Sequence, residues 1–203
     1  MTIRLHRGDL PDLSRYPRSV AIDTKTMGLQ PQRDRLCLVQ LSPGDGSADV
    51  VQIAAGADAP NLKRLLADPA VMKIFHFARF DIAVLFKTLG VMPAPVYCTK
   101  IASRLTRTYT DKHGLKDLVR EVLGIDLSKH QQSSDWGAEE LSEAQVAYAA
   151  SDVLHLHALK VKLDAMLARE GREALALACF GFLPDRARLD LLGWSEEDIF
   201  AHS

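Results

Sequence analysis

Three aspartates lie far apart in the chain in settings where a carboxylate could hold a metal ion. Asp23 ends the apolar stretch SVAIDT, Asp81 follows KIFHF, and Asp152 lies within the apolar run AYAASDVLHLHAL. An acid in such surroundings costs stability unless it is paired, exposed or bound to metal. Carboxylates that converge on two divalent ions can hydrolyse a phosphodiester, because one ion activates water and the other stabilises the leaving oxygen.

Each of these residues also has an ordinary structural explanation. Asp81 would enter a helix, where the helix dipole favours an acid in the first turn. Tyr148 lies four residues before Asp152 and would share its helix face. A phenol placed there can orient a metal-bound water, although a tyrosine on an alanine-rich helix more often packs with its hydroxyl at the surface. Alone each residue is weak support for a metal site, whereas their joint occurrence is strong support.

A mixed sheet with helical cover has to position these side chains. Alternating and apolar runs predict strands at 19–24, 35–42, 48–53, 72–77 and 95–100. Helical patterns cover 60–67, 78–89, 101–105, 114–123, 142–170 and 172–179. We therefore expect an α/β protein with a mixed five-stranded sheet, helices on both faces and a helical C-terminal half. This is the element order of the ribonuclease H-like fold, and ligands in such sheets gather at strand ends, where Asp23 is expected.

Length and charge limit the kinds of protein this chain could be. Its 203 residues suffice for one sizeable domain and are too few for two comfortable ones. The net charge of -1 argues against a protein that coats long nucleic acid, but it allows an enzyme that binds a few nucleotides at a strand end. Such an enzyme needs only a local basic cluster, for which the candidates are Lys100, Arg104, Arg107, Lys112 and Lys116. A solvated helix face explains this cluster equally well.

The cysteines indicate the compartment. Cys37, Cys98 and Cys179 are odd in number and lack C-x-x-C spacing, and the N-terminus has no apolar signal core. This predicts free thiols in a reducing cytoplasm and no membrane attachment. No histidine pairs with a cysteine at zinc-finger spacing, so we expect no structural zinc site.

Four patches together resemble the ribonuclease D branch of the DEDD 3′-5′ exonucleases, whose third motif is Y-x-x-x-D. The first motif resembles AIDTKTMGL at 21–29, the second HFARFD at 76–81, and the third YAASD at 148–152. The connecting segments HGLKDL, LGIDLSK and QQSSDW are also similar, so the resemblance extends from Val20 to about Leu159.

The resemblance implies an enzyme that hydrolyses RNA, such as tRNA precursors, from the 3′ end with two Mg²⁺ or Mn²⁺ ions. Asp23 would bridge both ions, Asp152 would help hold the ion that activates water, and Asp81 would support the second. Tyr148 would position the nucleophile. Nucleoside 5′-monophosphates would be the products.

A second group of residues would bind the substrate if the resemblance holds. Met27 and Leu29 would wedge against the terminal base, and His76 and Phe80 would shape the cleft around the last nucleotides. The loop near the substrate would contribute Lys129, Gln132 and Trp136. For the apolar members of this group, simple packing in the core explains the sequence equally well.

Lys25 departs from the family pattern D-x-E, which places a metal-binding glutamate at this position. A lysine about 4 Å from a divalent ion is repelled by roughly 8 kcal/mol at an effective dielectric near 20. Lys25 should therefore weaken or abolish binding of the water-activating ion. Its flexible stem would instead allow a salt bridge with Asp23 or Asp152, which would fill the vacant site with an ammonium group.

A second departure concerns domain organisation. Long family members carry a helical nucleic-acid-binding domain after the nuclease domain, and the segment after Trp194 is too short for one. We expect a single 3′-5′ exonuclease domain over 1–203, with its motifs in a core of about 20–160. Substrate binding would then depend on that domain, on a homodimer or on a partner protein.

Three explanations of Lys25 stay open. The first is an engineered or accidental substitution in an otherwise active enzyme. The second is a natural loss of catalysis in a protein that still binds RNA. The third is an active variant that binds its metal ions with fewer protein ligands. We favour the first because the other four site residues are present.

The predicted function is an exoribonuclease impaired by Lys25, and the alternatives are a catalytically silent module that binds RNA 3′ ends and a DNA 3′-5′ exonuclease. Nothing in the sequence distinguishes RNA from DNA as substrate.

Overall fold

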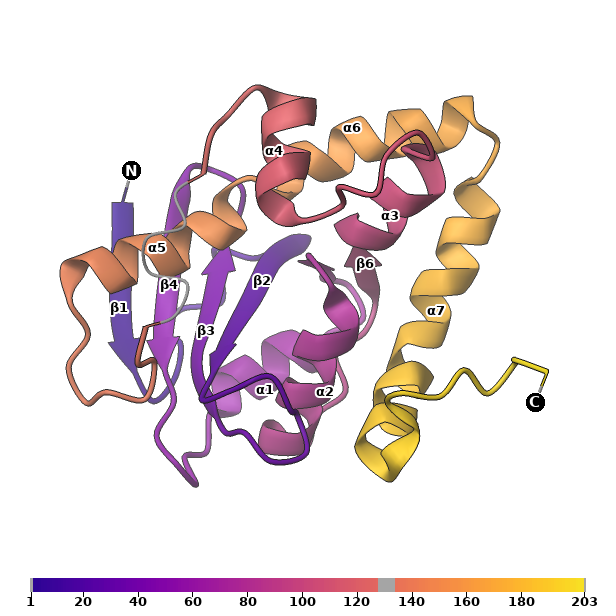
Figure 1. Ribbon diagram of the computed structural model, residues 1–203. Coiled ribbons are helices and arrows are strands. Elements are labelled where there is room, and N and C mark those ends of the chain that lie inside the picture. The colour runs from indigo at the N-terminus through magenta and orange to yellow at the C-terminus, as the bar shows by residue number, and fades with distance from the viewer. Residues whose placement is uncertain (1, 128–133, 203) are drawn as a thin grey trace.

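Six strands form one mixed sheet in the order β1-β4-β3-β2-β5-β6 in the computed structural model, which describes residues 2–127 and 134–202 (Figure 1). Strands β2, β3 and β4 pair antiparallel as a meander, whereas β1 joins β4, β5 joins β2 and β6 joins β5 in parallel. Their bounds are β1 Thr2–Arg7, β2 Ser19–Thr26, β3 Leu36–Ser42, β4 Ser47–Gln52, β5 Met72–Phe75 and β6 Val96–Cys98. The expected ribonuclease H-like mixed sheet is confirmed, with one strand more than predicted.

Strand β1 is the one that the sequence prediction misses. Its sequence TIRLHR has no apolar run, and its side chains are exposed or only partly buried. It forms the edge of the sheet by parallel pairing with β4, from Thr2 opposite Ser47 to Arg7 opposite Gln52. Because this pairing joins segments far apart in the chain, it leaves no turn signal between neighbouring strands.

The helices cover both faces of the sheet. They are α1 Pro60–Ala67, α2 Ala78–Leu89, α3 Thr99–Thr106, α4 Leu115–Leu123, α5 Glu143–Leu154, α6 Leu156–Arg169 and α7 Glu173–Leu189, followed by a short π-helical turn at Asp190–Trp194. Helix α5 packs across the four strands β1, β4, β3 and β2. Helices α1 and α2 lie behind the sheet in the view of Figure 1. Every residue of β3 is consequently buried.

Two helical predictions need correction. The single helix expected at 142–170 is divided at His155, whose φ of -106° and ψ of -3° lie outside the α-helical range and separate α5 from α6. The helix expected at 172–179 continues to Leu189 through Pro184. Its buried residues Ala176, Phe180, Leu183 and Ala187 recur at helical spacing, and α7 packs mainly against α2.

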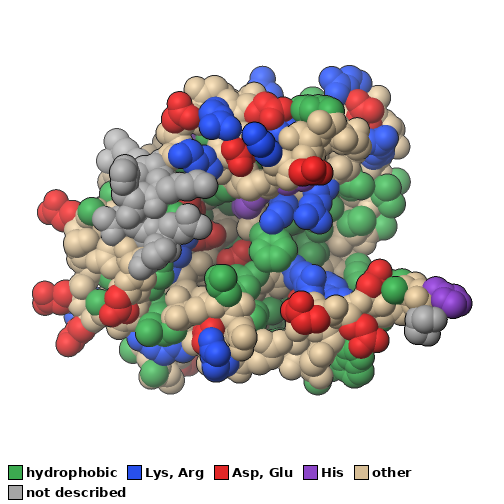
Figure 2. All heavy atoms as spheres, viewed as in Figure 1, with side chains coloured by type: hydrophobic (Ala, Val, Ile, Leu, Met, Phe, Trp, Pro, Cys, Tyr) green, Lys and Arg blue, Asp and Glu red, His purple; other side chains and the backbone are tan. Residues whose placement is uncertain are grey.

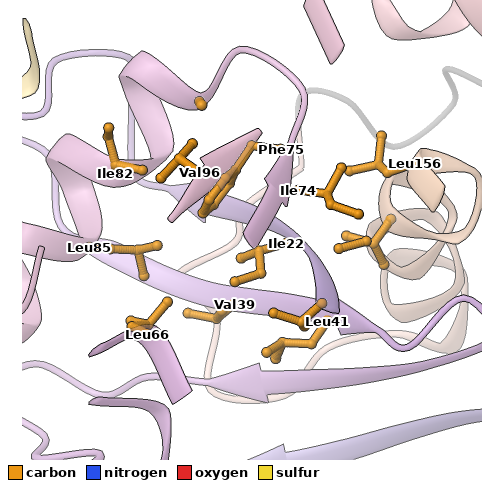
Figure 3. Close-up of a cluster of buried hydrophobic side chains, with 14 of the residues drawn as sticks. Ile22, Val39, Leu41, Leu66, Ile74, Phe75, Ile82, Leu85, Val96 and Leu156 are labelled. Carbon is orange, nitrogen blue, oxygen red and sulfur yellow. The ribbon is translucent and has the colours of Figure 1, made fainter. Parts of the chain in front are cut away.

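Apolar side chains from strands and helices meet in the core between β2 and α2 (Figure 3). Ile22 and Val39 on neighbouring strands are fully buried, as are Leu66 of α1 and Leu85 of α2. Burying one such side chain contributes about 1.5–3 kcal/mol. The core thereby fixes β2, which also carries Asp23.

Neither a membrane helix nor a disulfide is found in the described part of the chain. Within residues 2–127 and 134–202, every helix is too short or too polar to cross a bilayer. Cys37 and Cys98 are buried free thiols and Cys179 is a partly exposed one, as expected.

Candidate active site

Strand β2 directs Asp23 and Lys25 to the same side of the sheet, because residues two apart on a strand share a face. The pairing of β2 with β3 shifts register between Lys25 and Thr26, and such irregularities re-aim side chains at strand ends. Asp23 and Lys25 line a cavity of about 300 Å³ together with His76, Tyr148 and Asp152. Figure 2 shows a hollow on this face, with acidic and histidine side chains toward its back and Lys and Arg along its upper rim.

Helix α5 brings the third motif to the cavity. Ser142 caps the helix by accepting a hydrogen bond from the Gln145 amide, and the Gln145 side chain accepts one from the Ser142 amide in return. This capping box fixes where the helix begins, so Tyr148 and Asp152 lie one turn apart on the same face. The Tyr148 ring stacks on Trp136 with 6.1 Å between ring centroids.

Lys25 joins the two motifs directly. Its Nζ lies 2.7 Å from Asp23 Oδ2 and 2.5 Å from Asp152 Oδ2, and its side chain is only 15% exposed. Burial would lower the pKa of Lys25, but the two carboxylates outweigh burial and hold the pKa above its ordinary value. The ammonium also lies 5.8 and 5.6 Å from the centres of the Trp136 and Tyr148 rings, within range of a cation–π attraction. Lys25 was expected to form a salt bridge with Asp23 or Asp152, and it forms one with each of them.

Asp81 contacts the backbone of β2 instead of the cavity. Its Oδ1 accepts hydrogen bonds from the Thr24 amide at 3.0 Å and the Thr24 hydroxyl at 2.7 Å. Burial, together with the charge of Asp23, raises the pKa of Asp81 well above its ordinary range. Asp81 thus connects the first turn of α2 to the strand that carries Asp23.

The predicted substrate residues occupy different settings. Met27 and Leu29 are 54% and 85% exposed, so core packing is the wrong explanation for both. They line a second cavity of about 510 Å³ with Phe80, which is partly buried, and Trp136, which is only 6% exposed. Lys25 lines both cavities. The predicted residues Lys129 and Gln132 lie outside the described residues.

His76 enters the first cavity as a neutral ring. Burial and the nearby charge of Lys100 lower the pKa of His76 to about 3. Its Nδ1 lies 2.9 Å from Thr99 Oγ1, while its buried Nε2 has no hydrogen-bond partner in the part of the chain that the structure describes.

The predicted basic cluster is only partly correct. Arg107 is fully buried, where its guanidinium forms an ion pair with Glu121 and bonds to Ser103 Oγ, so it is no surface cation. Lys116 lines the first cavity, whereas Lys100 and Arg104 line another one.

The sequence prediction misses Gln40. This residue lies directly opposite Asp23 in the pairing of β3 with β2, and it is fully buried. Neither polar atom of its side chain has a partner among the described residues. A glutamine within the apolar run LCLVQL is the signal that could have identified it.

The carboxylates of this chain do not fit the predicted two-ion site. Among residues 2–127 and 134–202, no group of three or more His, Cys, Asp or Glu side chains is arranged to hold a metal. The Lys25 ammonium lies between Asp23 and Asp152, and Thr24 uses one oxygen of Asp81. A divalent ion at this position would meet a cation of the same sign.

Comparisons with known proteins agree with the motifs. Residues 10–168 match a family model described as 3′-5′ exonuclease. Ribonuclease D of Gluconacetobacter diazotrophicus is 40% identical over 75% of this chain, which spans only 39% of that relative. Two solved structures of Brucella melitensis NrnC match over 100% of both chains. The one with bound Mg²⁺ is 62% identical with a TM-score of 0.96, and the one bound to pGG is 63% identical with a TM-score of 0.97.

Proposed function

This chain belongs to the 3′-5′ exonuclease family, and from that premise we propose that it binds the 3′ ends of RNA strands and that Lys25 impairs their hydrolysis. The observation that carries the proposal is the contact of one ammonium group with both Asp23 and Asp152. The relatives named Ribonuclease D and the NrnC structure bound to pGG support a nuclease that acts on RNA, and tRNA precursors are the substrates that the family resemblance implies.

The proposed roles follow from the side chains around Lys25. An acid at this position would add a fourth carboxylate to Asp23, Asp81 and Asp152, and this set suits the oxygen preference of Mg²⁺ or Mn²⁺. Two such ions would supply an activated water and a stabilised leaving oxygen. In the chain as it stands, Lys25 excludes an ion from between Asp23 and Asp152. Tyr148, one turn from Asp152, would orient the attacking water.

The second cavity is the proposed site of the terminal base. Met27 and Leu29 are exposed apolar side chains beside Phe80 and Trp136, which suits a flat, partly apolar ligand. The NrnC structure bound to pGG supports a nucleotide ligand for this chain. His76, a neutral ring that lines the first cavity, would help shape the cleft around the last nucleotides.

The decisive experiment compares nucleotide release from a 5′-labelled single-stranded RNA by this chain and by its Lys25→Glu variant. With Mg²⁺ or Mn²⁺, we expect the unmodified chain to be at least about 100-fold slower, because an ion that stabilises the transition state contributes several kcal/mol. Lys162→Glu on the exposed side of α6 is the matched control, since it makes the same charge change away from the site and should stay slow.

Further substitutions test the assignment itself. In the Lys25→Glu background, Asp23→Asn, Asp81→Asn and Asp152→Asn should each remove activity, and turnover in all three would refute the assigned site. If neither parent chain releases nucleotides while both bind RNA, the silent binding module is the better description. Competition between RNA and DNA strands of one sequence separates the DNA exonuclease alternative.

We also propose three properties of the molecule as a whole. The free cysteines favour a reducing cytoplasm. Residues 1–203 are proposed to form one exonuclease domain, and homodimerisation is proposed as an additional source of RNA affinity. Sedimentation velocity with and without RNA would test the last of these.

A further inference from the structure

The Lys25 side chain lies within the wall of the cavity and is held by contacts there, instead of extending into solvent. Its ammonium contacts Asp23 on its own strand and Asp152 on α5, while the rings of Trp136 and Tyr148 lie within 6 Å. The cation is therefore held by residues from three separate parts of the chain. A charge fixed in this way acts at one position, as a bound ion does, but cannot dissociate.

Lys25 offsets much of the acidic charge around the first cavity. The acids Asp23, Asp117 and Asp152 line it together with the cations Lys25 and Lys116. Three acids and two lysines give the lining a net charge of -1. Replacing Lys25 by an acid would leave four acids and one lysine, a net charge of -3, which would repel a phosphodiester unless cations were supplied from solution.

We propose that the Lys25 ammonium takes the place of a divalent ion as counter-charge, so that the cavity binds the 3′ end of an RNA strand without any metal. The inference rests on the proposed function, because the ligand is the same RNA end. It goes beyond that function because it assigns Lys25 a positive role in binding in addition to its effect on hydrolysis.

Metal and RNA binding should then be independent in this chain. If Mg²⁺ has no place between Asp23 and Asp152, it cannot raise RNA affinity, and by reciprocity RNA cannot raise Mg²⁺ affinity. Mg²⁺ should also leave the unfolding temperature unchanged, since a ligand stabilises only a protein that binds it. In the Lys25→Glu variant, both couplings should be present.

The test measures fluorescence anisotropy of a 5′-labelled single-stranded RNA whose last linkage is a phosphorothioate, which slows cleavage. Each chain is titrated in EDTA and in Mg²⁺ at matched ionic strength, because salt alone changes RNA affinity. For the unmodified chain, the two Kd values should agree within about twofold. Lys25→Glu should bind at least about tenfold more weakly in EDTA than in Mg²⁺, and only this variant should gain thermal stability from Mg²⁺. Lys162→Glu, with the same charge change, should behave as the unmodified chain.

The remaining outcomes distinguish a failure of the inference about Lys25 from a failure of the proposed function. If the unmodified chain binds RNA only with Mg²⁺, or only Lys25→Glu binds, the inference about Lys25 is wrong and the proposed RNA-end site remains. If both chains bind equally well in EDTA, Lys25 is not the counter-charge and the inference is also wrong. If neither chain binds RNA in any condition, the proposed function itself fails.

Discussion

Lys25 and Lys73 are both buried lysines, and their surroundings affect ionisation in opposite ways. Lys25 lies between two carboxylates, which hold its pKa above the ordinary value despite its burial. Lys73 on β5 is fully buried, and among the described residues its ammonium donates hydrogen bonds only to the backbone carbonyls of Asp68 and Ala94. Burial lowers the pKa of Lys73 to about 8. Two carbonyl dipoles thus compensate a buried charge less well than two ionised acids do.

The Lys73 shift predicts how stability depends on pH. Between about pH 8 and the unfolded value of 10.5, the unfolded chain binds more protons than the folded chain, so the free energy of unfolding should rise with pH. At 1.36 kcal/mol per pKa unit, the rise is about 3 kcal/mol. Urea unfolding of the unmodified chain and of Lys73→Met from pH 7 to 10.5 measures it. Tyrosines and cysteines ionise in both chains, so their contribution cancels when the two free energies of unfolding are subtracted. If the free energies of the two chains change with pH in parallel, the prediction is wrong.

Helices and strands were predicted correctly where the sequence pattern that indicates them lies within the segment itself. The strands from β2 to β6 and the helices from α1 to α4 combine apolar runs with turn or cap residues nearby, and all were predicted. Strand β1 was missed because it is an exposed edge strand whose partner lies some 45 residues away in sequence. The extension of α7 was missed because Pro184 reads as a stop signal, whereas packing against α2 keeps the helix continuous.

Part of the site could be predicted from the sequence. The resemblance of the motifs to the family implied that Asp23, Tyr148 and Asp152 lie near one another, and the flexible side chain of Lys25 allowed a salt bridge with Asp23 or Asp152. Arg107 was misplaced on the surface because its burial depends on Glu121, a partner on another helix. Charge patterns alone do not say whether an arginine is solvated or paired. Such pairing is a tertiary property that local sequence does not encode.

Helix α5 carries two site residues, so its N-terminal cap should influence the stability of the site. Ser142→Ala removes the hydroxyl that accepts from the Gln145 amide and should lower the free energy of unfolding by about 1 kcal/mol. Ser151→Ala on the same helix is the control, because its hydroxyl donates to the Tyr148 carbonyl one turn earlier instead of capping the helix, and alanine is the better helix former. Urea denaturation of both variants provides the comparison. Equal losses of stability in the two variants would contradict a specific role for the cap.

Over the whole molecule, most arginines near the helical side are already paired. Arg79 and Arg186 both bind Asp190, and Arg107 binds Glu121. Within the described residues, Lys100, Arg104 and Lys116 enter no ion pair, and they line cavities on the helical side of the molecule. With a net charge of -1, the molecule has no excess of positive charge to attract a long phosphate backbone.

This distribution predicts short-range RNA binding with a weak salt dependence. If Lys25 and the three cavity-lining cations named above each contact one phosphate, log Kd should change with log salt by a slope of about 3, at about 0.7 per contact for a single strand. Affinity should also stop rising once the strand is a few nucleotides long, because the cations proposed to bind it line the cavities named above. Titrations of strands of three lengths, each at four NaCl concentrations, give both quantities. A slope that grows steadily with strand length would instead require a basic path beyond the cavities, and the RNA would then be held along its length and not at its end.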